Sequence, residues 1–166
     1  MVAESSGTIR DATSADFDAI LALNAESVRF LSPLDAPRLR MLHALAAYHR
    51  VVEIDGAVVA FLLALREGTD YDSPNYRWFA ARYDSFLYID RVVVAGARQG
   101  HGLGARLYTD LFACARDRRL ARIVCEFDLD PPNPASAQFH ARQGFREVGR
   151  QWIGDGKKEV SLQSRE

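Results

Sequence analysis

Four closely spaced glycines, at positions 96, 100, 102 and 104, separate an apolar run from an amphipathic segment. The apolar run, residues 86–94, is typical of a strand, and residues 102–117 carry a helical stripe of Leu103, Leu107, Leu111 and Ala115. Glycine lets a backbone approach a ligand closely, and the first turn of a helix offers unpaired N–H donors with a partial positive charge. This arrangement predicts a site for a pyrophosphate.

Two other interpretations of the glycine turn compete with this one. The turn could be a connection that holds no ligand, although three glycines at alternate positions of a helix start cost stability. Residues 100–105 also match the dinucleotide fingerprint G-x-G-x-x-A, with Glu126 at the end of the next strand as the ribose-binding acid. That fingerprint wants its first glycine at the strand tip, however, whereas residues 95–99 intervene here, and too little chain remains for a doubly wound sheet.

The wider sequence around the turn resembles one known family. Residues 99–104, Gln-Gly-His-Gly-Leu-Gly, fit the Q/R-x-x-G-x-G/A motif of the GNAT superfamily of N-acetyltransferases. A strand ending in Val-x-Val precedes the motif, and a strand with a central acid, an Asn, a short helix and a Gly-Phe pair follow its helix: Glu126, Asn133, residues 134–142 and Gly144-Phe145. The resemblance is strong over residues 86–148. It implies an enzyme, an N-acetyltransferase that moves an acetyl group from acetyl-CoA to an amine by direct transfer.

The resemblance also implies which residues hold acetyl-CoA (coenzyme A), the expected cofactor. The backbones of Val92 and Val94 would pair with the pantetheine arm and aim the thioester at a gap between two splayed parallel strands, residues 86–94 and 121–127. Asn133 matches an Asn that contacts the coenzyme, but an Asn before a Pro is equally well a helix cap. Backbone groups of the motif would hold the pyrophosphate: Gln99, Gly100, His101, Gly102, Gly104 and Ala105.

Acetyl transfer needs a neutral amine, so a general base has to remove a proton from the ammonium form. Two acids could serve. Glu126 lies in mid-strand, where some family members carry a catalytic Glu, and Asp90 lies two residues before Val92 on the same strand face. An acid within an apolar strand costs desolvation unless it is paired or faces a cavity. Either acid could instead form a structural pair with Arg91 or Arg122.

His140 is a departure from the family pattern. Similar proteins often carry a Tyr four residues before the glycine of Gly-Phe, as the general acid for the leaving thiolate, and this chain has His140 there. Histidine can donate a proton near neutral pH, so the catalytic role could survive. The ring could equally serve only for packing or hydrogen bonding. Tyr88 and Tyr108 are alternative phenols, each with packing as the competing role.

The remaining pattern predicts a single α/β N-acetyltransferase domain over residues 1–166, with a mixed, mostly antiparallel central sheet flanked by helices. Asp55-Gly56 predicts a two-residue hairpin turn. The aromatic segment 68–84 is either a packed loop with a short helix or a substrate-facing lid. A first helix, capped by Thr13 or Ser14, would have an apolar side of Ile20, Leu21, Leu23 and Val28. Other helices are expected at residues 37–47, 102–117 and 134–142, and strands at 8–12, 48–54, 57–65, 86–94, 121–127, 145–153 and 157–162.

Composition limits the expected partners. The 166 residues carry 21 Lys plus Arg and 22 Asp plus Glu, a formal charge of −1, which gives no global reason to expect nucleic acid. The longest apolar run is too short to span a membrane, and residues 1–7 lack a signal-peptide pattern, so a cytoplasmic protein is expected. The four histidines and the cysteines Cys114 and Cys125 form no metal-type cluster in the sequence.

Several functional questions stay open in the sequence. The acceptor could be a small-molecule or a peptide amine, and a homodimer is possible. A non-catalytic acyl-CoA-binding module or sensor would share the glycine turn, and a structural subunit would need only the fold. Steady turnover of an amine separates the enzyme from both alternatives, and coenzyme A binding separates the sensor from the structural subunit.

Overall fold

The computed structural model describes residues 7–28 and 31–166. Residues 1–6, on which part of the expectation about a signal peptide rests, lie outside this range. The chain divides into two compact units. The N-terminal unit contains the chain up to Ala64 together with Arg91–Leu111, and the C-terminal unit contains Leu65–Asp90 and Phe112–Glu166.

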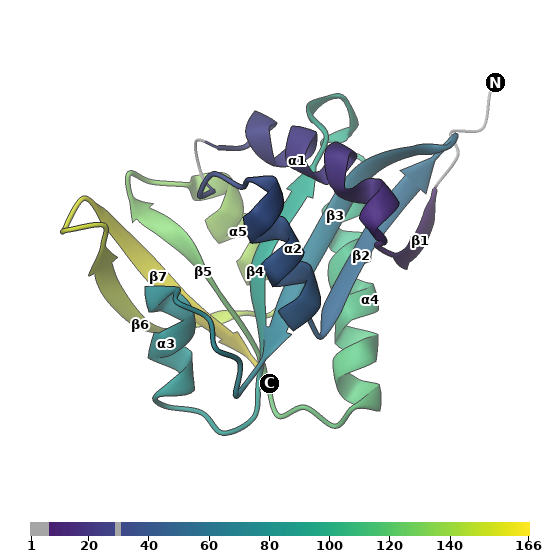
Figure 1. The fold of residues 1–166 in the computed structure, drawn as a ribbon. Helices are drawn as coiled ribbons and strands as arrows, with labels where there is room; N and C mark the ends of the chain where they lie inside the picture. The colour runs from purple at the N-terminus through teal and green to yellow at the C-terminus, as the bar shows by residue number, and fades with distance from the viewer. Residues whose placement is uncertain (1–6, 29–30) are drawn as a thin grey trace. The chain divides into compact units, whose positions relative to one another are not determined.

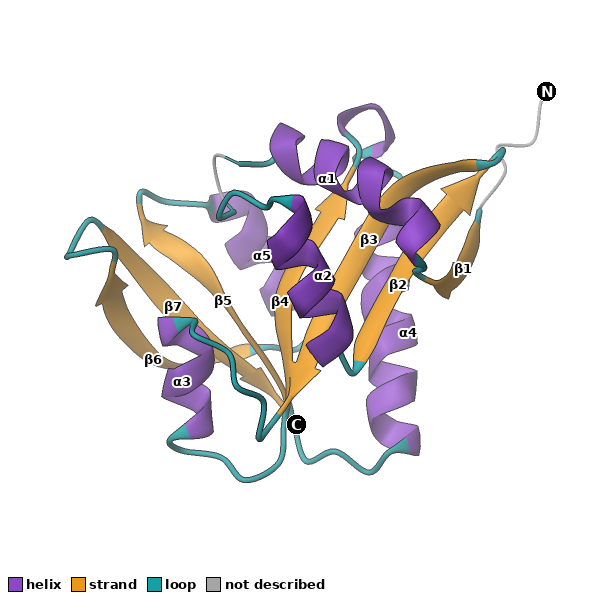
Figure 2. Ribbon diagram, viewed as in Figure 1, coloured by secondary structure: helices purple, strands orange, loops and turns teal. Residues whose placement is uncertain are grey.

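The N-terminal unit is built on an antiparallel ribbon (Figures 1 and 2). Strand β1 (Thr8–Asp11) pairs with β2 (Tyr48–Ile54), and β2 pairs with β3 (Ala57–Arg66). Asp55 and Gly56 join β2 to β3 with φ values of 52° and 78°. Positive φ at both positions is the requirement of a type I′ turn, so the predicted hairpin is confirmed.

Two helices, α1 (Phe17–Glu26) and α2 (Ala36–Leu45), lie over one face of β2 and β3 (Figure 1). Apolar residues of both helices and both strands share one buried cluster, which includes Ile20, Leu23, Leu39, Val51 and Phe61. The expectation that Val28 extends the apolar side of the first helix is wrong. The helix ends at Glu26, and Val28, which lies beyond this end, is 49% exposed.

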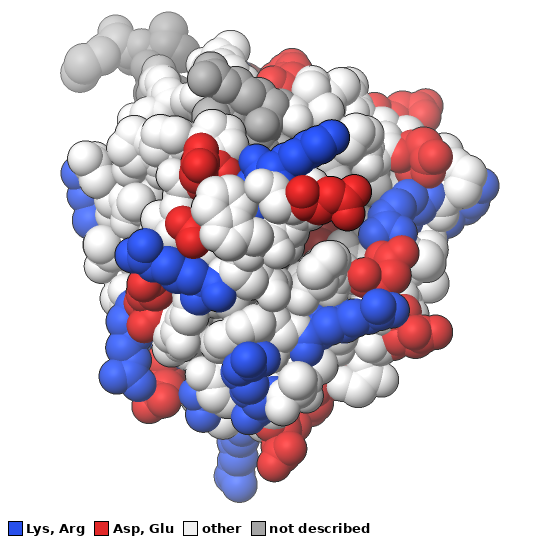
Figure 3. Space-filling model, turned by 90° about the vertical axis from the view of Figure 1, so that its left-hand side faces the viewer, with Lys and Arg blue, Asp and Glu red and all other residues white. Residues whose placement is uncertain are grey.

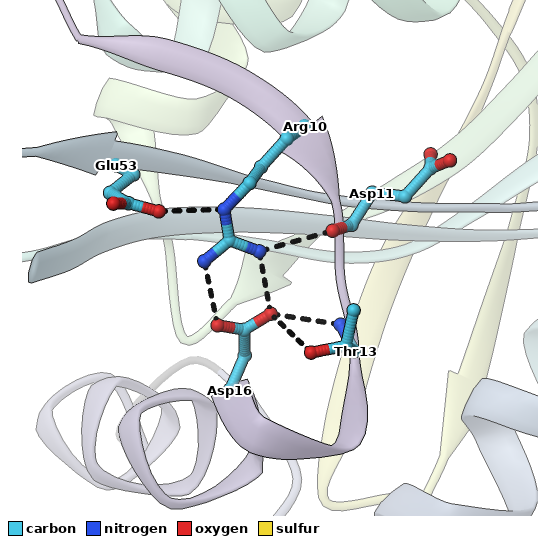
Figure 4. A network of polar contacts seen from close by, with 5 residues as sticks. All are labelled: Arg10, Asp11, Thr13, Asp16 and Glu53. Carbon is cyan, nitrogen blue, oxygen red and sulfur yellow. Dashed lines mark hydrogen bonds and ion pairs between the residues drawn. The ribbon is translucent and has the colours of Figure 1, made fainter. Parts of the chain in front are cut away.

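An ion-pair network fastens β1 to the short 3-10 turn η1 (Ser14–Asp16) that precedes α1 (Figure 4). The Arg10 guanidinium donates to both carboxylate oxygens of Asp16 at 2.8 Å and to Glu53 at 2.6 Å. The backbone N–H of Thr13 also donates to Asp16, at 2.8 Å. Asp16 is buried. The hydrogen bonds from Arg10 are the main reason that the pKa of Asp16 falls to about 2.

Strand β4 runs over Leu87–Val94, and its first half belongs to the C-terminal unit. Three further strands complete this unit. β4 pairs in parallel with β5 (Ile123–Asp130) through Leu87↔Ile123 and Tyr88↔Val124, at the start of both strands. β7 (Lys158–Arg165) lies antiparallel between β5 and β6 (Arg146–Ile153). Helix α5 (Pro134–Arg142) connects β5 to β6, within the bounds that the sequence predicts.

The aromatic segment contains helix α3 (Pro74–Ala80), which is capped by Ser73. Tyr71, Tyr76 and Phe79 are buried. The rings of Tyr76 and Tyr88 meet edge-on with centroids 5.5 Å apart, and Phe79 lies 6.0 Å from Tyr88. The segment is therefore packed through its own aromatic side chains, as one of the two interpretations predicts.

Helix α4 (Leu103–Asp117) begins directly after the glycine turn, and its predicted stripe of Leu103, Leu107, Leu111 and Ala115 is buried. Across the described residues the strands form one seven-stranded sheet in the order β1-β2-β3-β4-β5-β7-β6. The chain is thus an α/β protein with a mostly antiparallel sheet, one parallel pair and flanking helices, as predicted.

The surface drawn in Figure 3 carries acidic and basic side chains that are interspersed. Within residues 7–28 and 31–166, no helix combines the length and the apolar character that a membrane span requires.

Candidate active site

The glycine turn in the N-terminal unit forms a cradle of backbone amides. Gly100 and Gly102 have φ values of 81° and 78°, which L side chains rarely adopt. A Cβ atom built on either glycine meets no other heavy atom within 4 Å, so the turn faces open space. The first helical bond of α4 runs from the N–H of Arg106 to the carbonyl of Gly102, at 3.0 Å. The amides of Leu103, Gly104 and Ala105 precede that bond and point out of the helix start.

The strand end before this turn is held by contacts of its own. Val93 is buried in the core, whereas Val92 and Val94 alternate with it and are half-buried. The N–H of Gly96 lies 3.3 Å from a carboxylate oxygen of Glu26, and the Gln99 amide donates to the Val94 carbonyl at 3.4 Å. The structure thus brings the predicted pyrophosphate residues together in one turn at the tip of β4.

A second candidate centre lies in the C-terminal unit, at Glu126. The parallel register places Tyr88 opposite Val124, two residues before Glu126 on the same strand face. The Tyr88 hydroxyl donates to both carboxylate oxygens of Glu126, at 3.0 and 2.9 Å. The Asn75 side chain of α3 acts to lower the pKa of Glu126. Glu126 as a whole residue has intermediate exposure.

Burial raises the pKa of Glu126 to about 8. The negative charges of Asp90 and Asp128 act in the same direction, and the Tyr88 hydrogen bonds and the Asn75 side chain oppose them. Burial also raises the pKa of Tyr88, so the phenol keeps its proton. A carboxyl group that titrates near pH 8 can take up and release a proton under ordinary conditions, which suits a general base.

The other acids near Glu126 have partners of their own. The Tyr71 hydroxyl donates to Asp90, and Lys158 lies 3.1 Å from Asp128. The arginines that could have formed structural pairs contact other groups: Arg122 lies 3.4 Å from Glu166, and Arg91 donates to Asn24 at 2.9 Å. Each of the two candidate bases thus accepts a hydrogen bond from a tyrosine hydroxyl: Glu126 from Tyr88, and Asp90 from Tyr71.

His140 lies on the other side of β5 from Glu126. Its ring stacks on Phe127 at 5.8 Å, and adjacent residues of a strand point to opposite faces. The His140 Nδ1 atom lies 2.8 Å from the carbonyl of Ser136, which places the proton on Nδ1 because a carbonyl only accepts. Burial lowers the pKa of His140, so the neutral ring with an unprotonated Nε2 is favoured. These contacts fit a packing role better than that of a proton donor.

The ends of α5 show why two of the predicted residues occur where they do. The Asn133 side chain accepts from the N–H of Ser136 at 3.3 Å, so Asn133 caps the helix. At the other end, Gly144 has a φ of 86°, its N–H bonds to the carbonyl of Ala141, and that of Phe145 bonds to the carbonyl of His140. This pattern is a Schellman motif, which confirms Gly144 as the predicted C-terminal cap.

Two polar side chains of the C-terminal unit, Asn75 and Gln151, belong to no sequence motif. The Gln151 amide donates to the Asn75 carbonyl oxygen at 2.8 Å, and Asn75 is buried. Asn75 lies in the aromatic segment 68–84, for which a substrate-facing lid is one of the two interpretations. Gln151 carries no comparable signal, because it is one polar residue in an ordinary strand pattern.

Comparison with known proteins places the chain in a family. The model of the acetyltransferase (GNAT) family matches residues 17–145. A phosphinothricin N-acetyltransferase of Streptomyces coelicolor is 43% identical over 58 residues, which is 35% of this chain and 33% of that protein. The match thus spans about a third of the length of that relative.

Solved structures show the same fold. Ard1 from Thermoplasma volcanium has a TM-score of 0.79 at 16% identity, with 97% of each chain covered. Arabidopsis thaliana Naa50, in complex with the bisubstrate analogue CoA-Ac-MVNAL, has a TM-score of 0.73 at 13% identity over 98% of this chain and 99% of that one. Because the family model covers most of the chain, this protein belongs to the acetyltransferase (GNAT) family.

Proposed function

We propose that the protein is an acetyl-CoA-dependent N-acetyltransferase in which Glu126 is the general base. The observation that carries this proposal is the Glu126 carboxyl group, which lies in a family fold, is held by Tyr88 and has its pKa raised to about 8. A sensor or a structural subunit would have no need of such a group. The alternative of a non-catalytic acyl-CoA-binding module finds no separate support.

The glycine turn fits the pyrophosphate of coenzyme A. It offers amides ahead of the first helical bond, and open space lies above Gly100 and Gly102 where a ligand can approach the backbone. Gln99, His101, Gly104 and Ala105 would contribute backbone groups, and Val92 and Val94 would face the pantetheine arm. Asn133 is engaged as a helix cap, which leaves its amide nitrogen as the group that could contact the coenzyme.

The chemistry assigned to the protein is proton removal at the acceptor. Acetyl-CoA would supply the thioester from which the acetyl group leaves. The Glu126 carboxylate accepts a proton from the ammonium form of the acceptor and so frees the lone pair of its nitrogen. Burial raises the pKa of the Cys125 thiol, which disfavours a thiolate nucleophile and supports direct transfer without an acyl-enzyme.

The acceptor we propose is a primary amine of a small molecule. The relative from Streptomyces coelicolor supports this class, and the acidic side chains of Asp90 and Asp128 near Glu126 would favour an incoming ammonium. A peptide amine is the alternative, since Naa50 binds an analogue that joins coenzyme A to MVNAL. A panel of small amines and short peptides with free N-termini distinguishes the two, by the rate at which coenzyme A is released.

Ligand-dependent thermal unfolding tests the cofactor. A ligand that binds only the folded state raises the apparent stability by mass action. We expect acetyl-CoA and coenzyme A to raise the Tm and NAD to leave it unchanged. Gly102→Asp should abolish the shift, because a carboxylate would occupy the place of the pyrophosphate. Gly156→Asp is the matched control: it has a φ of 80° and equally open surroundings in a turn between β6 and β7. Equal Tm shifts in both variants would show that the pyrophosphate does not bind at the glycine turn.

A cytoplasmic location and a homodimer belong to the same proposal. Cys114 and Cys125 are free thiols, as in proteins of reducing compartments. Strand β6 is the last strand in the sheet order, and its Trp152 is 53% exposed. Such an edge can pair with a second copy. Size-exclusion chromatography with light scattering would show a dimer, and Trp152→Glu should then shift it to a monomer.

A further inference from the structure

Helix α2 ends beside the start of β2 in the N-terminal unit (Figure 1), and two histidines join these elements. The Nδ1 atoms of His43, in α2, and His49, in β2, lie 2.8 Å apart. Their rings meet edge-on with centroids 5.0 Å apart. At this distance one proton has to lie between the two nitrogens, because two bare nitrogens or two N–H groups would repel each other. The pair is therefore a single hydrogen-bonded unit.

The two rings of this pair differ in burial. His49 is 8% exposed, whereas His43 is half-buried. Aromatic rings of other elements flank the pair: Phe61 of β3 lies 6.3 Å from the His49 ring, and Phe17 of α1 lies 5.1 Å from the His43 ring. The His49 Nε2 atom is buried and has no hydrogen-bond partner within the described part of the chain. A proton on this atom would therefore meet no acceptor there.

The burial of the His49 Nε2 atom decides how the pair responds to acid. While one proton stays between the Nδ1 atoms, every further proton has to bind an Nε2 atom. A neutral pair needs one such proton, and a singly charged pair needs both Nε2 atoms protonated. The charged pair thus directs an N–H group of His49, with part of the positive charge, to a place without an acceptor, which is costly. Opening the pair to water removes this cost, so uptake of a proton favours opening.

The charges around the pair favour the neutral state. Burial and the positive charge of His43 lower the pKa of His49 to about 4, and the negative charge of Asp16, on η1, opposes them. Hydrogen bonds from Arg10 keep the pKa of Asp16 at about 2, so its charge is constant over the range in which histidines titrate. Arg50, the next residue of β2, points to the opposite face and pairs with acids of β1 and α4.

We propose that His43 and His49 form a proton-sensitive latch on helix α2. With one shared proton the latch holds the last turn of α2 on β2, and uptake of a further proton from solvent releases that turn. The Arg10–Asp16 network keeps its charges over the same pH range and continues to hold η1 on β1. The latch contains no residue of the proposed acetyl-transfer machinery, so this inference does not rest on the proposed function.

Native-state hydrogen exchange of backbone N–H groups, followed by NMR in the free protein, measures the opening of the latch. Because the pKa of His49 is lowered, the latch should be closed above the ordinary value of 6.5 and should open increasingly as the pH falls toward 4. We expect the protection factors of residues 42–45 to fall about tenfold between pH 6.5 and pH 5, as uptake of one proton per opening requires. Protection factors in helix α4, which contains no histidine, should stay unchanged.

Three variants separate the latch from other effects of acid. In His43→Gln the side-chain amide can still accept a hydrogen bond from His49 but does not titrate, so the fall in protection should shrink to about threefold, because only the burial of His49 remains. In His49→Gln the fall should vanish. His101→Gln removes an exposed histidine of the glycine turn and should leave the fall of about tenfold in place.

Equal protection of residues 42–45 at pH 6.5 and pH 5 in the wild-type protein would overturn the proposal. A full fall in His43→Gln would do the same, since His49 would then respond without its partner, and so would a full fall in His49→Gln. If His49→Gln does not fold, His43→Gln decides the question, because its half-buried position can hold a polar side chain. The exchange measurement needs no substrate, so it tests the latch even if no amine is acetylated.

Discussion

The Arg10 network and the Glu126 centre each hold a carboxyl group among other polar side chains, with opposite results. Asp16 meets a guanidinium and a backbone N–H, and its pKa falls to about 2. Glu126 accepts hydrogen bonds from the Tyr88 phenol and lies near two other acids, and burial raises its pKa to about 8. A cationic partner fixes Asp16 in one charge state, whereas neutral donors leave Glu126 free to change its own. The first arrangement stabilises a fold, and the second suits proton transfer.

The largest expected effect is on activity at Glu126. Glu126→Gln keeps the shape and removes the proton acceptor, so we expect kcat/KM at pH 8 to fall by about 10²–10⁴-fold. The Tm should stay the same or rise, because a buried carboxyl group without a cationic partner contributes little to stability. Asp155→Asn, in the exposed turn before β7, is the control and should retain full activity. A Glu126→Gln enzyme with activity near that of the wild type would show that Glu126 is not the general base.

The opposite pattern is expected at Asp16. Asp16→Asn removes the charge that Arg10 faces, and we expect the free energy of unfolding to fall by about 2 kcal/mol. The loss is smaller than for a fully buried pair because Arg10 is 36% exposed and keeps Glu53. Specific activity of the folded fraction should be unchanged. Urea unfolding measures the difference, with Asp11→Asn as a control, since Asp11 is 82% exposed in its pair with Arg50 and should change stability by well under about 1 kcal/mol.

The pH dependence of stability should separate the two groups. The pKa of Asp16 is lowered, so its contribution is present above its ordinary value of 3.8 and is lost as the pH falls toward 2. The pKa of Glu126 is raised from 4.5, so its contribution is present below that value and is lost as the pH rises toward 8. Urea midpoints across this range should therefore rise with pH at the acid end and decline toward pH 8. Glu126→Gln should abolish only the decline of the urea midpoint toward pH 8. Asp16→Asn should abolish only its rise at the acid end.

The smallest expected effect is that of Tyr88→Phe. The change removes the hydrogen bond to Glu126 and leaves the aromatic packing against Tyr76 and Phe79 in place. Loss of one such donor corresponds to about 1 kcal/mol, so kcat/KM near pH 7 should fall about fivefold. The loss should be smaller at pH 9, where Glu126 is ionised with or without the phenol. A loss that is equal at both pH values would contradict this role of Tyr88.

Local features of the fold were predictable because they depend on neighbouring residues. Asp55-Gly56, the glycine turn and the Gly144-Phe145 pair each encode a backbone conformation, and the structure has positive φ at Asp55, Gly56, Gly100, Gly102 and Gly144. Glu126 and Asp90 could be nominated because acids within apolar strands are costly unless they have a role.

The partners of these acids could not be predicted in the same way. Asn75 and Gln151 are 76 positions apart, and their contact depends on the register of β6, which shifts between Glu147 and Gly149. Likewise, nothing in the local sequence shows that Asp16 meets Arg10 while Glu126 meets Tyr88. The side of β5 on which His140 lies also follows from packing against Phe127, which no spacing rule reveals.

The most direct test of the central claim is the pH dependence of kcat/KM with an acceptor amine whose own pKa lies well above 9. We expect kcat/KM to rise with pH to a plateau, with a midpoint near the Glu126 pKa of about 8. In Glu126→Gln this rise should be absent, and the residual kcat/KM should not depend on pH around pH 8. The same rise in both enzymes would show that another group removes the proton, and Glu126 would not be the base.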